Sequence, residues 1–391
     1  MRLIDYIFLL FLVVMSLDPT GYFLPIKDVL FAILVGYGLL KCITCKVPIK
    51  GYNFITICSI ILFPLWGILI ASTFGKLEDE AYAMSQVRSM FYILIFLFMV
   101  TLRVEKLLKI FWINGCILAT VTLLLFVYGQ YNETFFNNVL YEIGNQSNNY
   151  KMAIDREFLG IKMNGLYFTT GSFIILTFIY HLYNYHGRFR FVLSAILFLS
   201  MIFCGSRTPA LIQIFILCFY LYDKKILGKN LARIGVVVAV VSLFVLTFFL
   251  ATEEGANDIK FENYDSYISE ITKDPQSFLI GAGVGSTFKA AGNDNAVVAF
   301  TELSYMDVLR MYGVPFGLYF IFLFCYPIVV GYKWARQNLF YKRFFLGYVL
   351  FLLLLGTNPL LLGSPGLTGL TLFMAIVNKP QCMLQNNWTN G

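Results

Sequence analysis

The sequence predicts an all-α fold, with a single membrane domain over residues 1–391 and about twelve transmembrane helices. The composition is 59% hydrophobic, 18% aromatic and only 13% charged, which lies outside the range of soluble domains of this length. Apolar runs that suit a hydrocarbon core of about 30 Å recur along the whole chain. Lys and Arg gather in alternate connections, as expected of cytoplasmic loops.

The apolar runs define the expected spans in order. The first run begins at the start of the chain, and no small-residue cleavage site follows it, so we interpret it as a transmembrane helix and not as a signal peptide. The expected spans lie near residues 4–18, 22–40, 52–73, 86–102, 108–128, 165–184, 190–205, 208–222, 233–251, 303–331, 344–356 and 361–378.

The distribution of charge predicts the orientation. Basic residues cluster in the connections near 41–50, 103–109, 188–190, 224–233 and 333–343. The positive-inside rule places these connections and both termini in the cytoplasm. Two long loops of the opposite set, at about 129–164 and 252–302, therefore face outward. The net charge of +7 is modest and gives no indication of nucleic acid as a partner.

The two long loops are expected to carry the chemistry, because loops of this length are usually functional. Residues 129–164 are rich in Asn, Tyr and Phe, which suits sugar hydroxyls and the apolar faces of sugar rings. The same composition also fits a polar loop with aromatic anchors at the membrane interface. In the second loop, "NYDSYISEITKDPQSFL" is amphipathic and predicts helices on the membrane surface.

Glycines follow that amphipathic stretch in "IGAGVGSTF". Gly283 and Gly285 predict either a turn where the backbone approaches a ligand closely or a flexible turn leading back into the membrane. No strand–turn–helix context supports a nucleotide loop. The one Cys-x-x-Cys pair, Cys42 and Cys45, has no second pair or His beside it, so we expect no zinc site.

Cations occur at the outer ends of several expected spans. Arg207 lies at the tip of the tight hairpin "FCGSRTPAL", and Arg88 lies about one turn inside its span. Arg156 and Lys162 lie in the first long loop. The positive-inside rule does not favour cations on this side, so each is expected to have a partner or a function.

The stretch "TELSYMDVLRMYG" places ionisable groups where a helix enters the membrane. Asp307 and Arg310 are three residues apart and share a helix face, and Glu302 precedes them. One interpretation is an intramembrane ion pair that fixes helix packing. The other is a cavity open to the outside, because ionisable groups at membrane depth face bundle interiors or water-filled pockets.

Several cations around one outer pocket suit an anionic ligand that is itself bound to the membrane, and we favour a lipid-linked pyrophosphate. Arg binds phosphate oxygens through a planar fork and stays charged. It can also neutralise the charge that develops on a departing pyrophosphate. A carboxylate would accept the proton of an attacking sugar hydroxyl, and the candidates are Glu302, Asp307 and Asp294.

The motifs "FCGSRTPALI", "FLIGAGVGSTF" and "ELSYMDVLRMYGVPFGLYFIFL", in this order around a long outer loop, resemble the bacterial O-antigen and capsule polymerase family (Wzy). That family belongs to a superfamily that also contains O-antigen ligases. The motif resemblance covers roughly residues 190–330. It implies a GT-C-like glycosyltransferase of the inner membrane that needs no metal or other cofactor.

The resemblance also implies a reaction and its partners. A growing glycan would pass from undecaprenyl pyrophosphate to an incoming lipid-linked repeat unit at the periplasmic face. The expected partners are this lipid-linked oligosaccharide, membrane lipid and a chain-length regulator protein.

Carried onto this sequence, the resemblance matches Arg207 with the arginine of the family's Ser-Arg hairpin and Arg88 with an arginine near the outer end of an earlier span. Glu302, Tyr305 and Arg310 match the Glu-x-x-Tyr segment and the helix after it. Arg156 departs from the family pattern, because the glycines after it, at positions 160 and 165, follow at different spacing.

Two alternatives remain open. Ligases of the superfamily use a His in the large outer loop, whereas the two His residues here, His181 and His186, lie at the cytoplasmic end of an expected span, which favours a polymerase. A flippase or other transporter of lipid-linked glycans would also have many spans. The sequence shows neither an internal repeat nor a pair of interrupted helices, so a transporter is disfavoured.

Overall fold

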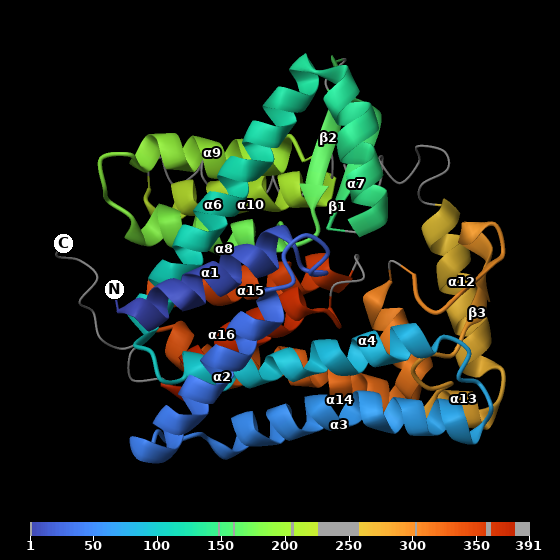
Figure 1. Cartoon of the computed structure of the whole chain (residues 1–391). Coiled ribbons are helices and arrows are strands. Elements are labelled where there is room, and N and C mark those ends of the chain that lie inside the picture. Colours follow the sequence, from blue (N-terminus) through green and yellow to red (C-terminus); the bar gives the residue numbers. More distant parts are fainter. Residues whose placement is uncertain are drawn as a thin grey trace.

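The computed structural model describes residues 2–147, 149–158, 161–204, 207–225, 258–301, 303–356 and 361–379. These residues are mostly helical (Figure 1). Five helical stretches are long and apolar enough to cross a membrane, namely Gly51–Thr73, Glu80–Met99, Val104–Tyr131, Ser304–Ala335 and Leu339–Gly356. The prediction of a helical membrane protein is confirmed. The number of twelve spans stays a prediction, and the expected span 233–251 lies outside the described residues.

The first half of the chain forms a helical layer with one strand pair. Its elements are α1 (Leu3–Leu17), α2 (Lys27–Thr44), α3 (Gly51–Thr73), α4 (Glu80–Met90), η1 (Phe91–Ile95), α5 (Phe96–Met99), α6 (Val104–Tyr131), η2 (Phe135–Leu140), α7 (Tyr141–Ser147), β1 (Tyr150–Phe158), β2 (Ile161–Phe168) and α8 (Ser172–Asn184).

The second half contributes further apolar helices and a small unit at one end of the molecule. Its described elements are α9 (Arg190–Ile202), α10 (Arg207–Asp223), α12 (Asp258–Thr272), α13 (Pro275–Ile280), β3 (Phe288–Ala290), η3 (Ala291–Asn293), β4 (Ala296–Val298), α14 (Ser304–Ala335), α15 (Leu339–Gly356) and α16 (Ser364–Asn378).

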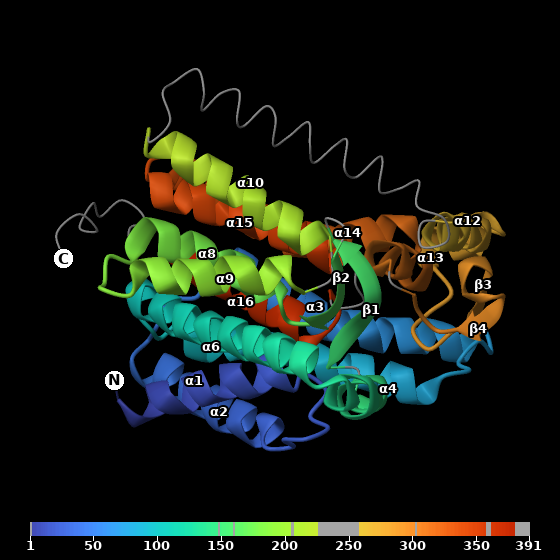
Figure 2. The same ribbon diagram turned by 90° about the horizontal axis from the view of Figure 1, so that it is seen from above.

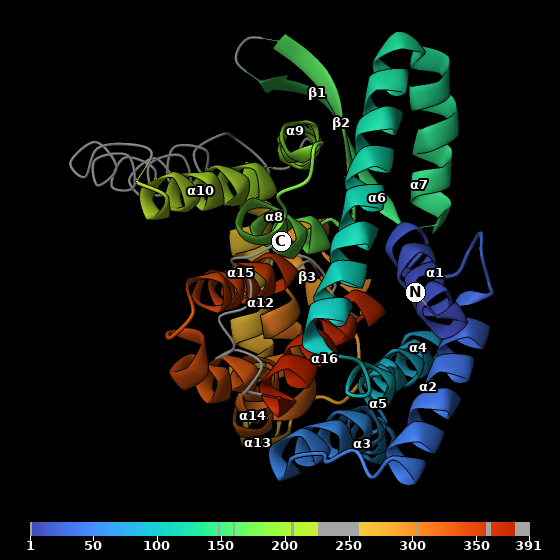
Figure 3. The same cartoon turned by 90° about the vertical axis from the view of Figure 1, so that its left-hand side faces the viewer.

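The core surrounds α16, which is buried along its whole length. Figure 3 shows this helix between α6 and α14. This helix contacts α14, α5 and η1, and its aromatic Phe373 stacks on Tyr348 of α15 with ring centroids 4.0 Å apart. Large apolar side chains on the outer helices remain exposed, including Ile43, Phe54, Leu124 and Val329. Exposed apolar surface of this extent is typical of helices that face lipid.

The bundle has two ends, and polar contacts mark one of them. At one, Lys106 pairs with Asp5 at 2.5 Å, and the Lys379 ammonium donates to the Leu102 carbonyl. We call this the basic end, and it lies at the left of Figure 1. The opposite end carries α12 and β3, and we call it the loop end. Figure 2 shows α12, β3 and β4 gathered there. The cytoplasmic location of the basic end stays a prediction.

The segment predicted as a loop at 129–164 is largely structured. After α6 it forms η2 and α7, and then a hairpin in which Tyr150 pairs with Phe168 and Phe158 pairs with Ile161. The expected span at 165–184 is therefore wrong at its start, because residues up to Phe168 belong to β2 and α8 begins at Ser172. Strand pairing satisfies backbone groups that a loop would leave to water.

Candidate functional site

The start of α14 lies beneath a unit formed by residues 258–301, which we call the cover. The cover comprises α12, α13 and the hairpin β3–β4, and it has a small hydrophobic core separate from the main one. This core consists of Tyr267, Ile271, Phe288 and Ala290. It packs against apolar side chains around the beginning of α14, namely Leu303, Met306 and Leu309.

Asp307 joins α14 to the cover. Its side chain is only 2% exposed, and its Oδ1 atom accepts a hydrogen bond from the Tyr267 hydroxyl. That hydroxyl also lies 3.0 Å from the Thr301 Oγ1 atom and accepts a hydrogen bond from the Thr301 N–H at 3.1 Å. Burial, together with the Asp307 carboxylate, raises the pKa of Tyr267, so this hydroxyl keeps its proton and acts as a donor.

Arg310 is held by the cover in a similar way. Its guanidinium donates to the Ser286 hydroxyl at 2.8 Å and to the Ala299 carbonyl at 2.6 Å. The guanidinium carbon also lies 4.6 Å from the centre of the Phe288 ring, a cation–π contact. The Arg310 Nε atom has no hydrogen-bond partner among the described residues. Among the described residues, this cation, which is 2% exposed, thus donates its hydrogen bonds to uncharged groups.

Neither sequence-based interpretation of this pair describes the structure. Asp307 and Arg310 do not line an open cavity, because the cover encloses both side chains. They also form no direct ion pair among those of the described residues. The shared helix face was predicted correctly, but hydroxyl and carbonyl groups of the cover occupy the space around each charge. Such groups come from distant sequence, so spacing along one helix does not reveal them.

The glycine-rich turn at 281–285 is packed against protein backbone. Gly283 and Gly285 both have a φ of 86°, which only glycine adopts readily. A Cβ atom on Gly283 would lie 2.4 Å from the Ala71 nitrogen, and one on Gly285 would lie 2.9 Å from the Asp79 carbonyl oxygen. Close approach to other backbone therefore explains these glycines. Contact of either with a ligand stays a prediction.

The helix α14 is interrupted directly after the site. Gly313 has a φ of 75° and a ψ of 166°, which are not helical. It separates the first part of α14, which contains Asp307 and Arg310, from the long apolar part of the helix. A Cβ atom at this position would lie 2.5 Å from the Leu279 carbonyl carbon of α13. The sequence predicts one continuous helix here, so the break is a correction to that expectation.

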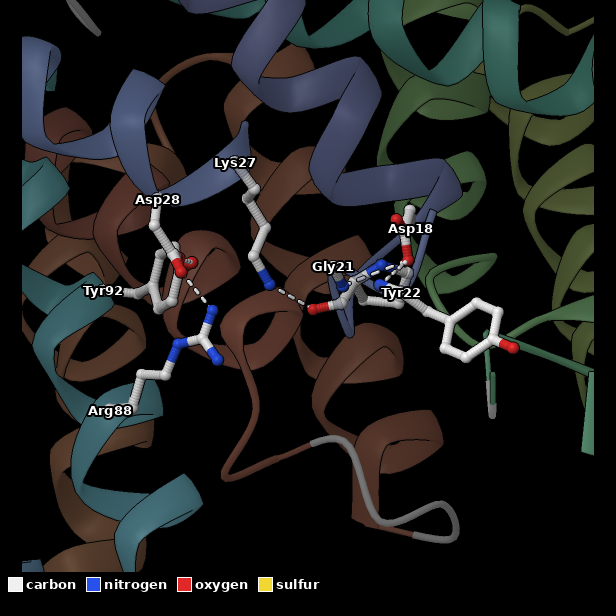
Figure 4. A network of polar contacts seen from close by, with 8 residues as sticks. Asp18, Gly21, Tyr22, Lys27, Asp28, Arg88 and Tyr92 are labelled. Atoms are coloured by element: carbon white, nitrogen blue, oxygen red, sulfur yellow. Dashed lines mark hydrogen bonds and ion pairs between the residues drawn. The ribbon is translucent and has the colours of Figure 1, made fainter. Parts of the chain in front are cut away.

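A second polar network lies at the same end, in the connection from α1 to α2 (Figure 4). Asp18 is buried and accepts hydrogen bonds from consecutive backbone N–H groups, including those of Phe23 at 2.7 Å and Leu24 at 2.6 Å. The Asn149 side-chain amide donates to it at 2.7 Å. Burial alone would raise the pKa of Asp18, but these hydrogen bonds outweigh it and hold the pKa below its ordinary value.

Arg88 belongs to this network. It lies on α4, where its guanidinium pairs with Asp28 at the start of α2, and the Tyr92 hydroxyl donates to the other oxygen of the same carboxylate. The Arg88 side chain is 60% exposed. Lys27 lies beside this pair, donates to the Pro19 carbonyl, and has its ammonium 5.1 Å from the centre of the Tyr92 ring.

The helix α4 connects the two networks. Tyr82, near its beginning, stacks on Phe300 of the cover with ring centroids 4.9 Å apart. The backbone N–H of Asp79, which caps this helix, donates to the Gly285 carbonyl at 2.9 Å. Arg88 lies in the last turn of the same helix. The structure thus places Arg88 and the buried pair of α14 at one end of the molecule, joined by one helix.

The remaining predicted site residues occupy separate positions. The Tyr305 hydroxyl donates to the Leu352 carbonyl of α15 at 2.8 Å, and Asp294 is exposed at the β3–β4 turn. Arg207 is the first residue of α10, and Arg156 and Lys162 lie in strands β1 and β2. The side chains of these three are not among those described. Glu302 lies outside the described residues.

Several residues of the site were not singled out from sequence. Tyr267, Ser286 and Asp18 organise the two networks; Ser286 lies in the motif "FLIGAGVGSTF", where only the glycines were singled out, and no motif marks Tyr267 or Asp18. A weak signal exists for Tyr267, because it shares one face of the amphipathic α12 with Ile271. Among the described residues, no group of three or more His, Cys, Asp or Glu side chains is placed to hold a metal ion. Independence from metal stays a prediction.

In comparisons with known proteins, neither a family model nor a curated protein sequence matches this chain.

Proposed function

We propose that this chain is a surface-polysaccharide polymerase, a membrane glycosyltransferase that extends a glycan carried on undecaprenyl pyrophosphate. The apolar helices and the gathering of cations and carboxylates at the loop end support this proposal. The acceptor would be the terminal sugar of an incoming lipid-linked repeat unit. The reaction would take place at the periplasmic face of the bacterial inner membrane.

The observation that carries the proposal is the buried Arg310, which forms no direct salt bridge with a carboxylate among the described residues. Removing a cation from water is expensive, and a charge kept in this setting without an ion pair is typical of a functional residue. Its neighbour Asp307 is buried in the same way. Displacement of the cover would present both groups to a substrate at the membrane boundary. In this proposal the observed arrangement is the closed state of the site.

The reaction assigns a role to each group. A sugar hydroxyl of the acceptor attacks the anomeric carbon of the donor glycan, and the bond from that carbon to the pyrophosphate oxygen breaks. Arg310 and Arg207 neutralise the charge on the departing pyrophosphate. The hydroxyl proton passes to a carboxylate, for which Asp307, Glu302 and Asp294 are the candidates. Arg88, with Arg156, Lys162 and Tyr305, contributes to binding of the lipid-linked substrates.

The test is gel analysis of surface polysaccharide from a deletion strain. The proposal predicts a single repeat unit on the lipid core and no ladder of longer chains. Complementation with the wild-type gene restores the ladder. A strain in which no repeat unit reaches the core would contradict the proposal and indicate a flippase or a ligase instead. A ligase is then distinguished from a flippase, because only a ligase-deficient strain accumulates polymer on its lipid carrier.

One observation favours a transporter as a second candidate. The interruption of α14 at Gly313 creates a short helix followed by a long one, and transporters build substrate sites from interrupted helices. A transporter-deficient strain would retain repeat units on the cytoplasmic leaflet. Labelling of lipid-linked repeat units with a membrane-impermeant reagent separates the two candidates, because a polymerase-deficient strain exposes them to the outside.

A further inference from the structure

Lys27 occupies a position that is unfavourable for a cation. It is the first residue of α2 and is only 4% exposed. The positive end of the helix dipole lies at this terminus, so a cation there is repelled. Among the described residues, its ammonium makes one hydrogen bond, to the Pro19 carbonyl, although it has three protons to donate.

A second cation, Arg88, lies near Lys27, as do the carboxylates of Asp28 and Asp18. Figure 4 shows the Arg88 guanidinium directed at Asp28 and the Lys27 ammonium directed at the Pro19 carbonyl, and the two cations are close enough to repel each other. The nearby carboxylate of Asp28 already binds Arg88 and the Tyr92 hydroxyl. The other acidic side chain of the network, Asp18, is occupied by backbone N–H groups and Asn149. Neither carboxylate hydrogen-bonds to the Lys27 ammonium in the structure.

The surroundings of this pair are apolar and exposed. Phe23, Leu24 and Ile26 lie in the connection before α2, and Val29 lies in its first turn. All four are among the exposed large hydrophobic side chains of the molecule. An anion that approaches the two cations therefore meets an apolar rim, which suits a ligand with both a charged head and a hydrocarbon tail.

We propose that Lys27 and Arg88 form a binding site for the phosphate group of a membrane lipid. Arg88, which is exposed, contacts the phosphate oxygens with the guanidinium nitrogens that Asp28 does not bind. The buried Lys27 supplies a second positive charge, and the first turn of α2 adds the positive end of its helix dipole. The phosphate belongs either to an anionic phospholipid or to a polyprenyl carrier. Binding of the polyprenyl carrier here rests on the proposed function, in which Arg88 contacts the lipid-linked substrate, whereas binding of a phospholipid does not; the assay needs no glycan, so failure of this site is distinguished from failure of glycan transfer.

The experiment measures lipid binding to the purified full chain in a neutral detergent. The probe is a fluorescent phosphatidylglycerol, and a diacylglycerol with the same acyl chains and label controls for hydrophobic binding. Unlabelled undecaprenyl phosphate and inorganic phosphate serve as competitors. The variants are Arg88→Gln and Lys27→Met. Lys41→Met is the matched control, because Lys41 is on the same helix and its ammonium lies 5.6 Å from the centre of the Tyr37 ring.

The site predicts that Arg88→Gln and Lys27→Met each weaken phosphatidylglycerol binding by about tenfold, as expected for loss of one charge-assisted contact. Lys41→Met and the diacylglycerol signal stay unchanged. Stronger competition by undecaprenyl phosphate than by unlabelled phosphatidylglycerol identifies the carrier as the preferred ligand, and the reverse identifies a phospholipid. Inorganic phosphate that competes as well as either lipid overturns the lipid assignment.

Thermal unfolding separates a binding role from a structural one. Replacement of a buried cation by an apolar side chain of similar size is often neutral or stabilising. A binding role therefore predicts that Lys27→Met unfolds at an equal or higher temperature than the wild type while it loses lipid affinity. Equal lipid affinity in the wild type, Arg88→Gln and Lys27→Met would overturn the proposal, and Arg88→Gln remains informative if Lys27→Met does not fold.

Discussion

The Tyr267 hydroxyl of α12 donates a hydrogen bond to the Asp307 carboxylate of α14, and both side chains are buried. This contact joins residues that are 40 positions apart in the chain. It fixes the cover over α14, the helix that carries the buried carboxylate of Asp307 and the buried guanidinium of Arg310. The position of the cover and the environment of Asp307 are therefore coupled.

Tyr267→Phe tests that coupling. The substitution leaves a buried carboxylate without its hydroxyl donor, which costs about 1–3 kcal/mol. We expect faster hydrogen exchange across residues 258–301 and unchanged exchange in α16. Tyr264→Phe is the control, because Tyr264 lies on the same helix but is exposed. Equal exchange in the cover of both variants would show that the hydroxyl does not hold the cover.

Gly313→Ala tests the interruption of α14. The φ of 75° is strained for Ala, and the new Cβ would lie 2.5 Å from the Leu279 carbonyl carbon, so α13 must shift. We expect a loss of at least about 2 kcal/mol, measured as a lower melting temperature in detergent. Gly36→Ala is the matched control, since no atom lies within 4 Å of its Cβ position, and Ala is the better helix former. A melting temperature as high as that of the control would contradict the observed break.

Asp18→Asn tests the connection between α1 and α2. One carboxylate oxygen of Asp18 accepts from the N–H groups of Gly21 and Tyr22, and the other accepts from those of Phe23 and Leu24. Asn has only one acceptor oxygen and cannot serve both pairs, so we expect a loss of about 2–3 kcal/mol at neutral pH. The pKa of Asp18 is lowered in the folded protein, so its ionised form contributes stability above the ordinary carboxyl pKa. That contribution is lost as the pH falls through the folded pKa. The difference in melting temperature between wild type and variant should hold from about pH 6 to 8 and shrink near pH 3. A difference that grows on acidification would contradict the role given to the carboxylate.

Asp223→Asn tests the packing of the basic end. Arg343 binds Asp223 through two nitrogen atoms, each at 2.6 Å, and the two side chains are 12% and 5% exposed. Breaking such a pair typically costs about 3–5 kcal/mol, because the remaining charge stays buried. Glu270→Gln is the control, since its pair with Lys273 is exposed and longer, at 3.8 Å, and contributes about 1 kcal/mol or less. Similar melting temperatures for the two variants would refute the structural role of Arg343.

Helices with long apolar runs were predictable from the sequence. The expected span at 52–73 agrees with α3, because hydrophobic residues predominate over its whole length, no charged residue interrupts them, and the basic Lys50 precedes it. The hairpin β1–β2 was missed, although apolar and polar residues alternate from Ile161 to Asn164 in β2, which indicates a strand. The apolar run at 165–184 predicted a helix, so the last residues of β2 were assigned to that helix.

The candidate site was predictable only in part. Spacing along one helix correctly placed Asp307 and Arg310 on a common face. It gave no information about the cover, whose Tyr267, Ser286 and Ala299 approach through tertiary contacts. With 25 tyrosines in the chain, no local pattern distinguishes Tyr267. The position of Arg88 beside Lys27 also depends on a tertiary contact, the pairing of Arg88 with Asp28.

The most direct test of the proposed function is glycan transfer by the purified protein. The wild-type chain, given undecaprenyl-pyrophosphate-linked repeat units, should form longer glycans and release one undecaprenyl pyrophosphate for each new linkage. The variants Arg207→Ala and Arg310→Ala should be folded in detergent but form no product. The control Lys41→Met should form product at the wild-type rate. Absence of chain growth by an intact wild-type protein, or full activity of both arginine variants, would contradict the account.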